Sequence, residues 1–140
     1  MTNILLPVDG SQSCTRAVRH VIRRAAAGTS MTLHLLNVQL PFSRAVSNAV
    51  PSKALESYHQ EQGQETLKSA KELLDAAGVA YVAHIAVGEP AETIAEYAKD
   101  RNIDEIVMGT RGMGSVASLL LGSCALKVVH LAEVPVTLVK

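Results

Sequence analysis

Aromatic side chains, cysteines and net charge are all scarce in this sequence of 140 residues. It contains no Trp, one Phe and three Tyr, which argues against the aromatic platforms on which single-stranded nucleic acids stack. Lys and Arg together number 13, as do Asp and Glu, so no overall field attracts nucleic acid. We therefore expect no nucleic-acid partner, an aliphatic core, and local contacts for any charged ligand.

The sequence also lacks long apolar runs. No uninterrupted stretch approaches the roughly 20 residues of a membrane span, and segment 1–7 lacks the basic and apolar regions of a signal peptide. Cys14 and Cys124 form no C-x-x-C pair, and a chain with this apolar content needs no disulfide framework. These absences predict a cytoplasmic protein with free thiols and no membrane contact.

What the sequence does contain is a regular alternation of two apolar patterns. Several short apolar runs have the length and composition of buried strands. They lie at 4–8, 31–38, 81–87, 103–108 and 136–139. Segments with helical periodicity separate these runs, and Gly28 and Gly78 stand where two of the helices are expected to end. The polar stretch Gln39–Ser52 is expected to be a loop.

Strict alternation of strands and helices implies a parallel sheet, because each helix returns the chain to the same end of the sheet by a right-handed crossover. We expect one α/β domain over residues 1–140, a doubly wound, Rossmann-like sheet of five parallel strands in the order 3-2-1-4-5 flanked by helices. In that order the first and fourth strands are neighbours whose connections diverge, which opens a crevice at their carboxyl ends. Asp9 and Gly109 are predicted to flank this crevice.

A segment rich in glycine follows the fourth predicted strand. It contains Gly109, Gly112 and Gly114, and Gly122 and Ser123 precede the last predicted helix. Glycines allow positive φ and close approach of main-chain amides to an anion, and Ser123 is placed to cap the helix. The pattern suits phosphate oxygens, but it is neither the P-loop nor the dinucleotide fingerprint. On spacing alone, a flexible loop followed by a helix cap explains these residues equally well.

These residues resemble the ATP-binding motif of the universal stress protein family. In that motif two residues separate the first two glycines, and nine more precede a glycine followed by Ser or Thr. Gly109, Gly112, Gly122 and Ser123 fit this spacing. Other segments also resemble the family, and they lie at 4–11, 87–91 and 134–136. The resemblance therefore extends over the whole chain.

The resemblance implies a site for an adenine nucleotide, with ATP as the expected ligand, with or without Mg²⁺. It implies that Asp9 and Val38 border the adenosine and that Gly109 lies beside the ribose. The amides expected to meet the phosphates belong to Gly112, Gly122, Ser123 and Cys124. Arg111 is a candidate for a further phosphate contact, with a position in solvent as the alternative. Neighbouring strand-end residues complete the expected site, namely Pro7, Val8 and Met108.

Simpler roles compete with some of these assignments. Asp9 precedes the first predicted helix, and its residue type alone favours a helix cap over a ligand contact. Cys14 and Cys124 lie near helix starts, where a lowered thiol pKa would permit redox sensing, although plain packing is the better expectation. The five histidines are too scattered to share a metal ion, so we expect no metal site and assign them surface or strand-edge positions.

The motif offers amides and a hydroxyl group but no residue suited to positioning water beside a terminal phosphate, so we expect binding without efficient turnover. The expected role is a stress-response switch or sensor that is read by an unknown partner protein. The alternatives are weak ATP hydrolysis or self-phosphorylation at Ser123 or a loop serine, a dimeric scaffold without nucleotide, and an adenylate-transferring enzyme.

The last apolar run is expected to lie at an edge of the sheet, where its unpaired backbone groups seek a partner. The family commonly pairs through this strand. The resemblance therefore implies an antiparallel homodimer with Val136 and Leu138 near its two-fold axis.

Overall fold

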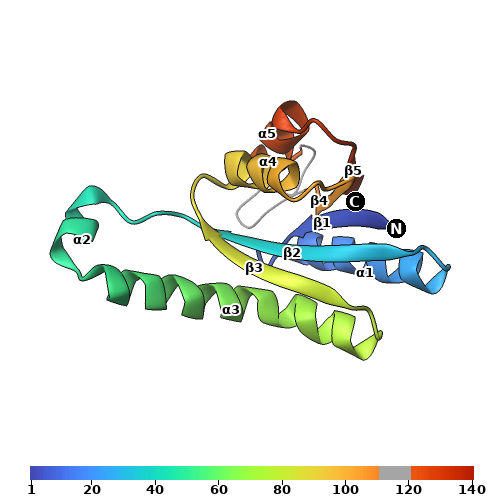
Figure 1. Ribbon diagram of the computed structural model, residues 1–140, viewed down its shortest axis with the longest axis horizontal. Helices are drawn as coiled ribbons and strands as arrows, with labels where there is room; N and C mark the ends of the chain where they lie inside the picture. The colour runs from blue at the N-terminus through green and yellow to red at the C-terminus, as the bar shows by residue number, and fades with distance from the viewer. Residues whose placement is uncertain (111–120) are drawn as a thin grey trace.

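In the computed structural model, which describes residues 1–110 and 121–140, strands alternate with helices (Figure 1). The strands are β1 (Thr2–Pro7), β2 (Met31–Gln39), β3 (Tyr81–Val87), β4 (Glu105–Gly109) and β5 (Val136–Val139). The helices are α1 (Gln12–Ala26), α2 (Arg44–Ala49), α3 (Ser52–Ala76), α4 (Pro90–Asp100) and α5 (Ser123–Leu131). The predicted alternation is confirmed, except that α2 lies inside the stretch expected to be a loop.

The strands form one parallel, five-stranded sheet in the order β3-β2-β1-β4-β5, which confirms the predicted topology. The central strand β1 pairs with β2 from Thr2 to Pro7 and with β4 through Ile4 and Leu5. The outer strands β3 and β5 pair with β2 and β4, respectively. The sheet therefore has its two edges at β3 and β5.

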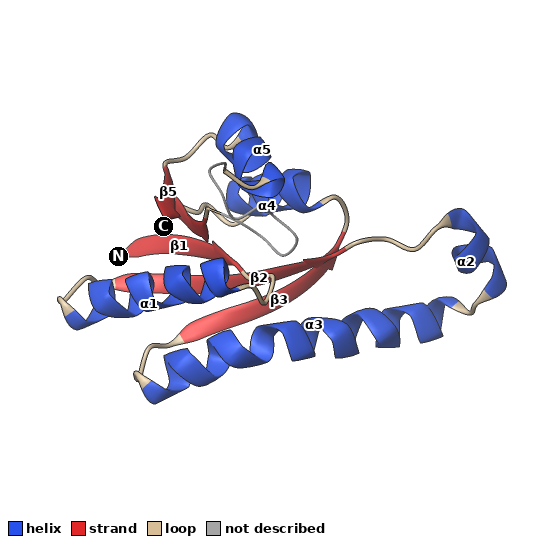
Figure 2. Cartoon of the chain, turned by 180° about the vertical axis from the view of Figure 1, so that it is seen from behind, coloured by secondary structure: helices blue, strands red, loops and turns tan. Residues whose placement is uncertain are grey.

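Helices cover both faces of this sheet, with α1 and α3 on one face and α4 and α5 on the other (Figures 1 and 2). Alternation along β1 explains the two layers. Ile4 and Leu6 pack into the core beneath α1 and α3, whereas Leu5 packs into the core beneath α4 and α5. All three side chains are completely buried, as the central strand of a doubly wound sheet requires.

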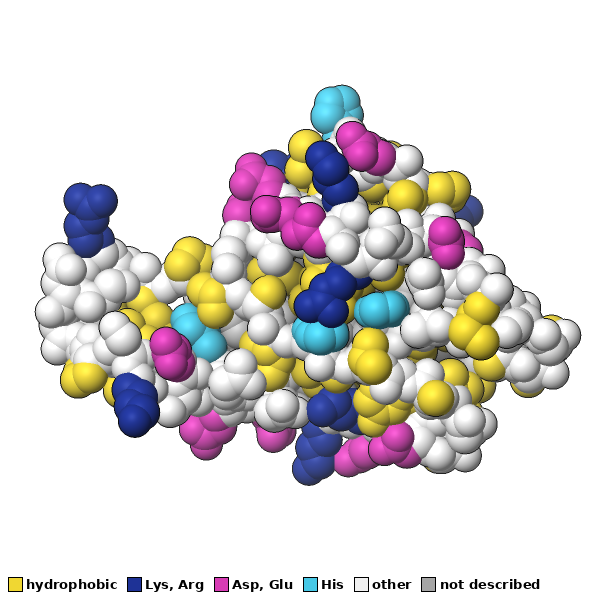
Figure 3. All heavy atoms as spheres, viewed as in Figure 1, with side chains coloured by type: hydrophobic (Ala, Val, Ile, Leu, Met, Phe, Trp, Pro, Cys, Tyr) yellow, Lys and Arg dark blue, Asp and Glu magenta, His cyan; other side chains and the backbone are white. Residues whose placement is uncertain are grey.

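The described surface mixes charges of both signs. Figure 3 shows acidic and basic side chains interspersed on one face, in keeping with their equal numbers in the sequence. Within residues 1–110 and 121–140, no helix is both long enough and apolar enough to cross a bilayer.

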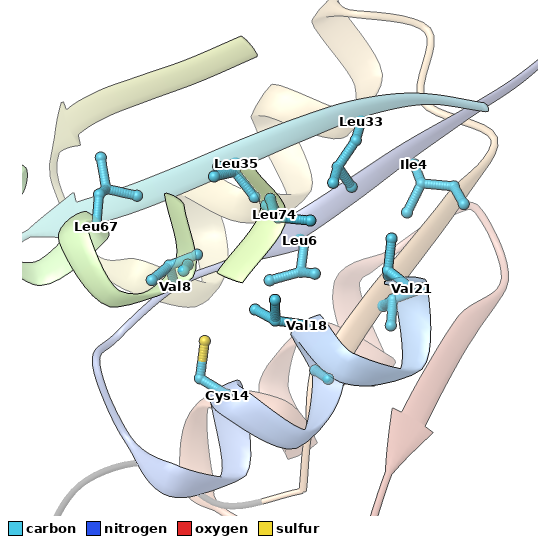
Figure 4. Packing of buried hydrophobic residues seen from close by; sticks show 13 residues of the cluster. Ile4, Leu6, Val8, Cys14, Val18, Val21, Leu33, Leu35, Leu67 and Leu74 are labelled. Atoms are coloured by element: carbon cyan, nitrogen blue, oxygen red, sulfur yellow. The ribbon is translucent and has the colours of Figure 1, made fainter. Parts of the chain in front are cut away.

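The core between α1, α3 and the sheet is aliphatic. Val18 and Val21 of α1 face Leu6 and Ile4 of β1, and Leu74 of α3 closes the same cluster (Figure 4). Each of these side chains is at most 1% exposed. Burial contributes about 1.5–3 kcal/mol for a side chain of this size, so this layer holds α1 and α3 against the sheet.

In the middle of α3, Gly63 is buried against β3. A Cβ atom on Gly63 would lie 2.6 Å from Cδ1 of Ile85, so glycine allows a close approach of helix and strand. That contact offsets the loss of about 1 kcal/mol of helix propensity relative to alanine. One turn earlier, His59 is also buried, and its ring centroid lies 4.6 Å from that of Phe42. The expectation of a surface or strand-edge position was therefore wrong for His59.

Helix α2 and the start of α3 extend beyond the sheet (Figures 1 and 2). Ser43 caps α2 by accepting a hydrogen bond from the N–H of Val46 at 3.3 Å, and Pro51 stands at the N-cap of α3. None of the residues of α2 is buried. The helix therefore has no apolar stripe from which the sequence could have predicted it.

Candidate functional site

The carboxyl ends of β1, β2 and β4 open onto a cavity of about 370 Å³. It lies at the crevice between β1 and β4, where the chain leaves the two strands in opposite directions. The first turns of α1, α4 and α5 complete its wall. Ligands of α/β sheets bind at such a position.

Most of the site residues predicted from the sequence line this cavity. They are Pro7, Val8, Asp9, Val38, Met108, Gly109, Ser123 and Cys124. Gly122 immediately precedes this wall as the N-cap residue of α5. Arg111 and Gly112 lie outside the described residues. The structure thus brings together residues from distant parts of the sequence.

Other lining residues were missed by the sequence interpretation. They are Ser11, Cys14, Leu36, Leu40, Pro90, Ile94 and Ala125. A usable signal existed for α4, because Pro90 opens a helix directly after β3 and parallel strands end at one edge of the sheet. The first turn of that helix therefore had to lie near the crevice.

Side-chain hydrogen bonds hold the turn that leads from β1 into α1. Gly10 has a φ of 80°, in the left-handed region that favours glycine. Asp9 Oδ1 accepts a hydrogen bond from the N–H of Ser11 at 2.9 Å, and Ser11 Oγ accepts one from the N–H of Cys14 at 3.1 Å. Ser11, and not Asp9, is therefore the N-cap of α1, which corrects the simpler role considered for Asp9.

Asn37 fixes the same turn from β2. Its side chain is buried, its Nδ2 donates to the carbonyl oxygen of Val8 at 2.8 Å, and its Oδ1 accepts from Gln39 Nε2 at 2.6 Å. The amide of Asn37 thus satisfies a main-chain carbonyl just beyond the last residue of β1. This arrangement positions the chain immediately before Asp9.

Gly109 is required by packing. A Cβ atom at this position would lie 2.6 Å from both the carbonyl carbon and the carbonyl oxygen of Ser13, in the first turn of α1. The φ of Gly109 is not in the left-handed region, so the expected need for positive φ does not apply to it. Its missing side chain instead allows α1 to approach the end of β4 at the cavity.

The start of α5 differs from the expectation in its cap. Gly122 is the N-cap, and Ser123 is the first helical residue, with no side-chain cap hydrogen bond among the described residues. The N–H of Gly122 donates to the carbonyl oxygen of Thr110 at 2.6 Å, so this amide is already engaged. The first helical bond joins Leu126 N to Gly122 O, which leaves the N–H groups of Ser123, Cys124 and Ala125 without helical partners.

Neither cysteine has the environment of a reactive thiol. Burial raises the pKa of Cys14 to about 11, and its Sγ lies 3.6 Å from the carbonyl oxygen of Pro7. Burial, together with the negative charges of Glu89 and Asp9, also raises the pKa of Cys124. The helix starts therefore do not lower the pKa of either thiol, and the redox hypothesis loses its chemical basis.

The described residues place few charged groups around the cavity. Of the described lining residues, Asp9 carries the sole carboxylate, and none is Lys, Arg or His. Glu89 caps α4 by accepting from the N–H of Glu92 at 2.8 Å, and its Oε1 lies 3.5 Å from Lys127 Nζ of α5. In the part of the chain that the structure describes, no three His, Cys, Asp or Glu residues are grouped to hold a metal ion.

Comparison with known proteins agrees with this architecture. The model of the universal stress protein family matches residues 1–140. A universal stress protein of Thermus aquaticus is 36% identical over 142 residues, which cover 98% of this chain and 97% of the relative. The solved structure of UspA from Lactobacillus plantarum, at 25% identity, has a TM-score of 0.81 and a match covering 99% of this chain and 97% of its own.

A second solved structure is that of the universal stress protein from Archaeoglobus fulgidus in complex with dAMP. It is 22% identical, with a TM-score of 0.71 and coverage of 100% of this chain and 98% of its own. At this identity the similarity shows a shared fold. Because the family model covers the whole chain and the sheet has the predicted order, the chain belongs to the universal stress protein family.

Proposed function

We propose that the cavity binds an adenine nucleotide, with ATP as the first candidate, and that the chain acts as a nucleotide-dependent switch or sensor in a stress response. One observation carries this proposal: an apolar compartment and a row of helix-start amides face the same cavity at the β1–β4 crevice. A volume of about 370 Å³ suits a small ligand.

The two ends of the cavity suit the two ends of a nucleotide. Val38, Leu36 and Ile94 supply an aliphatic wall for a base, and Gly109 lines the same cavity at the position proposed for the ribose. The N–H groups of Ser123 and Cys124 point out of the first turn of α5, where the helix dipole also favours anions. Gly122 would join them only if its N–H were released from Thr110.

Magnesium would be bound mainly through the ligand. Asp9 is the sole carboxylate among the described lining residues, so these residues supply at most one carboxylate ligand. Mg²⁺ commonly takes one or two carboxylates and completes its shell with phosphate oxygens and water. The residues therefore fit Mg²⁺ that enters with a nucleotide and do not fit a resident metal centre.

The dAMP complex of the Archaeoglobus fulgidus relative supports an adenine nucleotide as the ligand class. The relative shares the fold of this chain, and the residues of this chain's own cavity support the binding of such a ligand here. The choice of ATP over AMP depends on whether the α5 amides meet further phosphates.

The residues that line the cavity also suggest that ATP is hydrolysed slowly or not at all. Orienting a water molecule beside a terminal phosphate requires a base or an amide side chain close to it. The described lining offers Asp9, which is hydrogen-bonded to Ser11, and the hydroxyl groups of Ser11 and Ser123. We therefore propose a binding protein and not an efficient ATPase; weak hydrolysis and self-phosphorylation at Ser123 are the outcomes that a turnover assay must test.

Native mass spectrometry and calorimetry with ATP and Mg²⁺ test the binding. We expect a co-purifying adenine nucleotide, or saturable heat with a thermal shift. Val38→Glu should abolish both, because it places a charge in the aliphatic wall. Val87→Glu, at an exposed position on β3 outside the cavity, is the matched control and should bind normally.

Two results would overturn the proposal. Absence of heat and of stabilisation with ATP, ADP and AMP at millimolar concentration would leave a dimeric scaffold as the better function. Rapid hydrolysis that Gly122→Val abolishes would make the protein an enzyme.

The oligomeric state and the cellular location of the protein are also part of this proposal. β5 is an edge strand, and Val136 and Leu138 are only partly buried. We propose antiparallel pairing of two copies along β5, in a cytoplasmic protein read by a further protein partner. Light scattering at micromolar concentration should show a dimer.

A further inference from the structure

Helix α5 is apolar on more than one side. Its inner face buries Ala125 and Val128, as an amphipathic helix should. Three further large apolar side chains are nonetheless exposed, Leu126 by 60%, Val129 by 45% and Leu131 by 43%. A helix that is apolar around most of its circumference is normally covered on its outer side as well.

The exposed residues of α5 fall on two different sides. Lys127 and Leu131 face α4, because Lys127 Nζ lies 3.5 Å from Glu89 and Leu131 shares a small cavity with residues of α4. Side chains three or four residues apart share a helix face, whereas a shift of one or two residues turns the side chain away. Leu126 and Val129 therefore form a separate pair on the side turned from α4.

That side leads to the free edge of β5. Helix α4 contacts β2 and α5, and α5 in turn contacts β5, so moving from α4 across α5 leads towards the sheet edge. Val136 and Leu138 of β5 pack in the same layer as α5 and are only partly buried. Together, Leu126, Val129, Val136 and Leu138 form an apolar surface, the α5–β5 strip, beside unpaired backbone groups.

A second copy of this chain is the occupant that fits the strip. The segment Val136–Val139 contains no charged residue and no proline, the two devices that commonly protect a strand edge. Two such edges can pair antiparallel about a two-fold axis, and this pairing places the two α5–β5 strips face to face. The strip thus continues the strand-edge interface proposed above.

The strip is connected to the cavity by a short hydrogen-bonded path. The N–H of Gly122, at the start of α5, donates to the carbonyl oxygen of Thr110 at 2.6 Å. The N–H of Thr110 donates to the carbonyl oxygen of Val139, the last residue of β5, at 3.3 Å. One residue therefore joins the start of the cavity-lining helix to the end of the edge strand.

We propose that nucleotide binding and self-association through the α5–β5 strip are thermodynamically linked through α5. This inference rests on the proposed function. A phosphate group on the N–H groups of Ser123 and Cys124, which have no partners within the helix, stabilises a short helix that has no side-chain cap among the described residues, and so holds Leu126 and Val129 in place for the partner. The linkage is positive and reciprocal: nucleotide tightens the dimer, and the dimer tightens nucleotide binding by the same factor.

Sedimentation velocity of the whole chain with and without ATP and Mg²⁺ tests this proposal, paired with calorimetry above and below the dimer dissociation constant. We expect saturating ATP to lower that constant by about 5-fold or more, the lower range of allosteric coupling. Leu126→Glu and Val129→Glu should weaken the dimer and raise the Kd for ATP by up to the same factor. Leu131→Glu, on the side facing α4, is the matched control and should leave the dimer constant unchanged.

The outcomes separate this inference from the proposed function. If the wild-type chain binds ATP and its dimer constant is the same with and without ATP, the linkage is wrong while the nucleotide site stands. A chain that binds ATP and remains monomeric throughout also overturns the linkage, as does Leu131→Glu dissociating the dimer as strongly as Leu126→Glu. Absence of ATP binding by the wild-type chain overturns both.

Discussion

Helices α1 and α5 both begin at the cavity, and their N-termini are capped differently. Helix α1 starts at Ser11, whose Oγ accepts from Cys14 N, and the carboxylate of Asp9 accepts from Ser11 N. Helix α5 starts at Gly122 without a side-chain cap among the described residues. The first N–H groups of α1 are thus partly satisfied from within, whereas those of Ser123, Cys124 and Ala125 in α5 have no partner within their helix.

This difference indicates which helix serves stability and which serves binding. A side-chain cap contributes about 1 kcal/mol to stability, and the described residues provide none for α5. A negative ligand at α5 would supply a comparable contribution through the helix dipole and the first N–H groups of the helix. The comparison predicts that substitutions at the two helix starts have different consequences.

The largest effect is expected where α1 meets β4. Gly109→Ala places a Cβ atom against the main chain of Ser13, which cannot move without displacing the first turn of α1. We expect a loss of about 2 kcal/mol in the free energy of unfolding, within the range for overpacked sites. Urea denaturation with the nucleotide removed measures it.

Gly63→Ala is the control for this substitution, because its Cβ atom would lie equally close to a neighbour, the side chain of Ile85. A side chain can shift, and alanine is the better helix former by about 1 kcal/mol. Gly63→Ala should therefore cost less than Gly109→Ala. Equal losses would show that the α1 contact is no more rigid than the α3 contact.

Supplying α5 with a cap should have opposite effects on stability and binding. The N-cap Gly122 has a φ of −60°, which other residues adopt, so Gly122→Asp provides a carboxylate for the first turn. We expect the chain without nucleotide to gain about 0.5 kcal/mol from the cap and the dipole. The Kd for ATP should rise about 10-fold, equivalent to about 1.4 kcal/mol, because the carboxylate repels phosphate. Gly122→Asn, which caps without charge, is the control and should weaken ATP binding less; equal losses would argue against an electrostatic cause.

Removing a hydroxyl group should affect α1 more than α5. Ser11→Ala deletes the cap of α1 and should lower the free energy of unfolding by about 1 kcal/mol. Ser123→Ala should change it by less than about 0.5 kcal/mol, because the Ser123 side chain caps no helix end among the described residues. Thermal unfolding of both variants without nucleotide checks the difference. A larger loss for Ser123→Ala would reverse the comparison.

The last effect concerns the thiol of Cys14 at the start of α1; it is absent at neutral pH and appears only in alkaline solution. The pKa of Cys14 is raised from its ordinary value of 9.0 to about 11 in the folded chain, so the folded state holds its proton more tightly than the unfolded state. Stability from this group is therefore complete below pH 9.0 and declines as the pH rises towards about 11. Cys14→Ala should flatten that decline in alkaline unfolding curves. An unchanged slope would mean that the thiol is not protected by burial.

The fold was predictable because the apolar residues of each strand and of α1 are spaced for burial. Ile4, Leu5 and Leu6 form a run that is buried on both faces, which is typical of a central parallel strand. Helix α2 could not be predicted, since none of its residues is buried and its visible support is the cap from Ser43. Gly63 could not be interpreted either, because its role depends on Ile85, more than 20 residues away along the chain.

The candidate site was predictable where the family spacing applies, and less so where tertiary packing decides. The strand ends around Asp9 and Gly109 meet at one cavity as expected. The cap of α5 falls on Gly122 because Ser123 already has helical geometry, and such a one-residue shift is beyond sequence patterns. Leu40 and Ile94 line the cavity because of the tertiary fold, and no sequence motif marks them.

Asn37 has a consequence for how a ligand meets this protein. Its buried amide holds the carbonyl of Val8 beyond the last residue of β1, so that wall of the crevice is formed before anything enters. Binding there incurs little conformational entropy for ordering the wall, and affinity arises from the contacts themselves. The base end of the cavity would then be a preformed, rigid site that selects ligands by their shape.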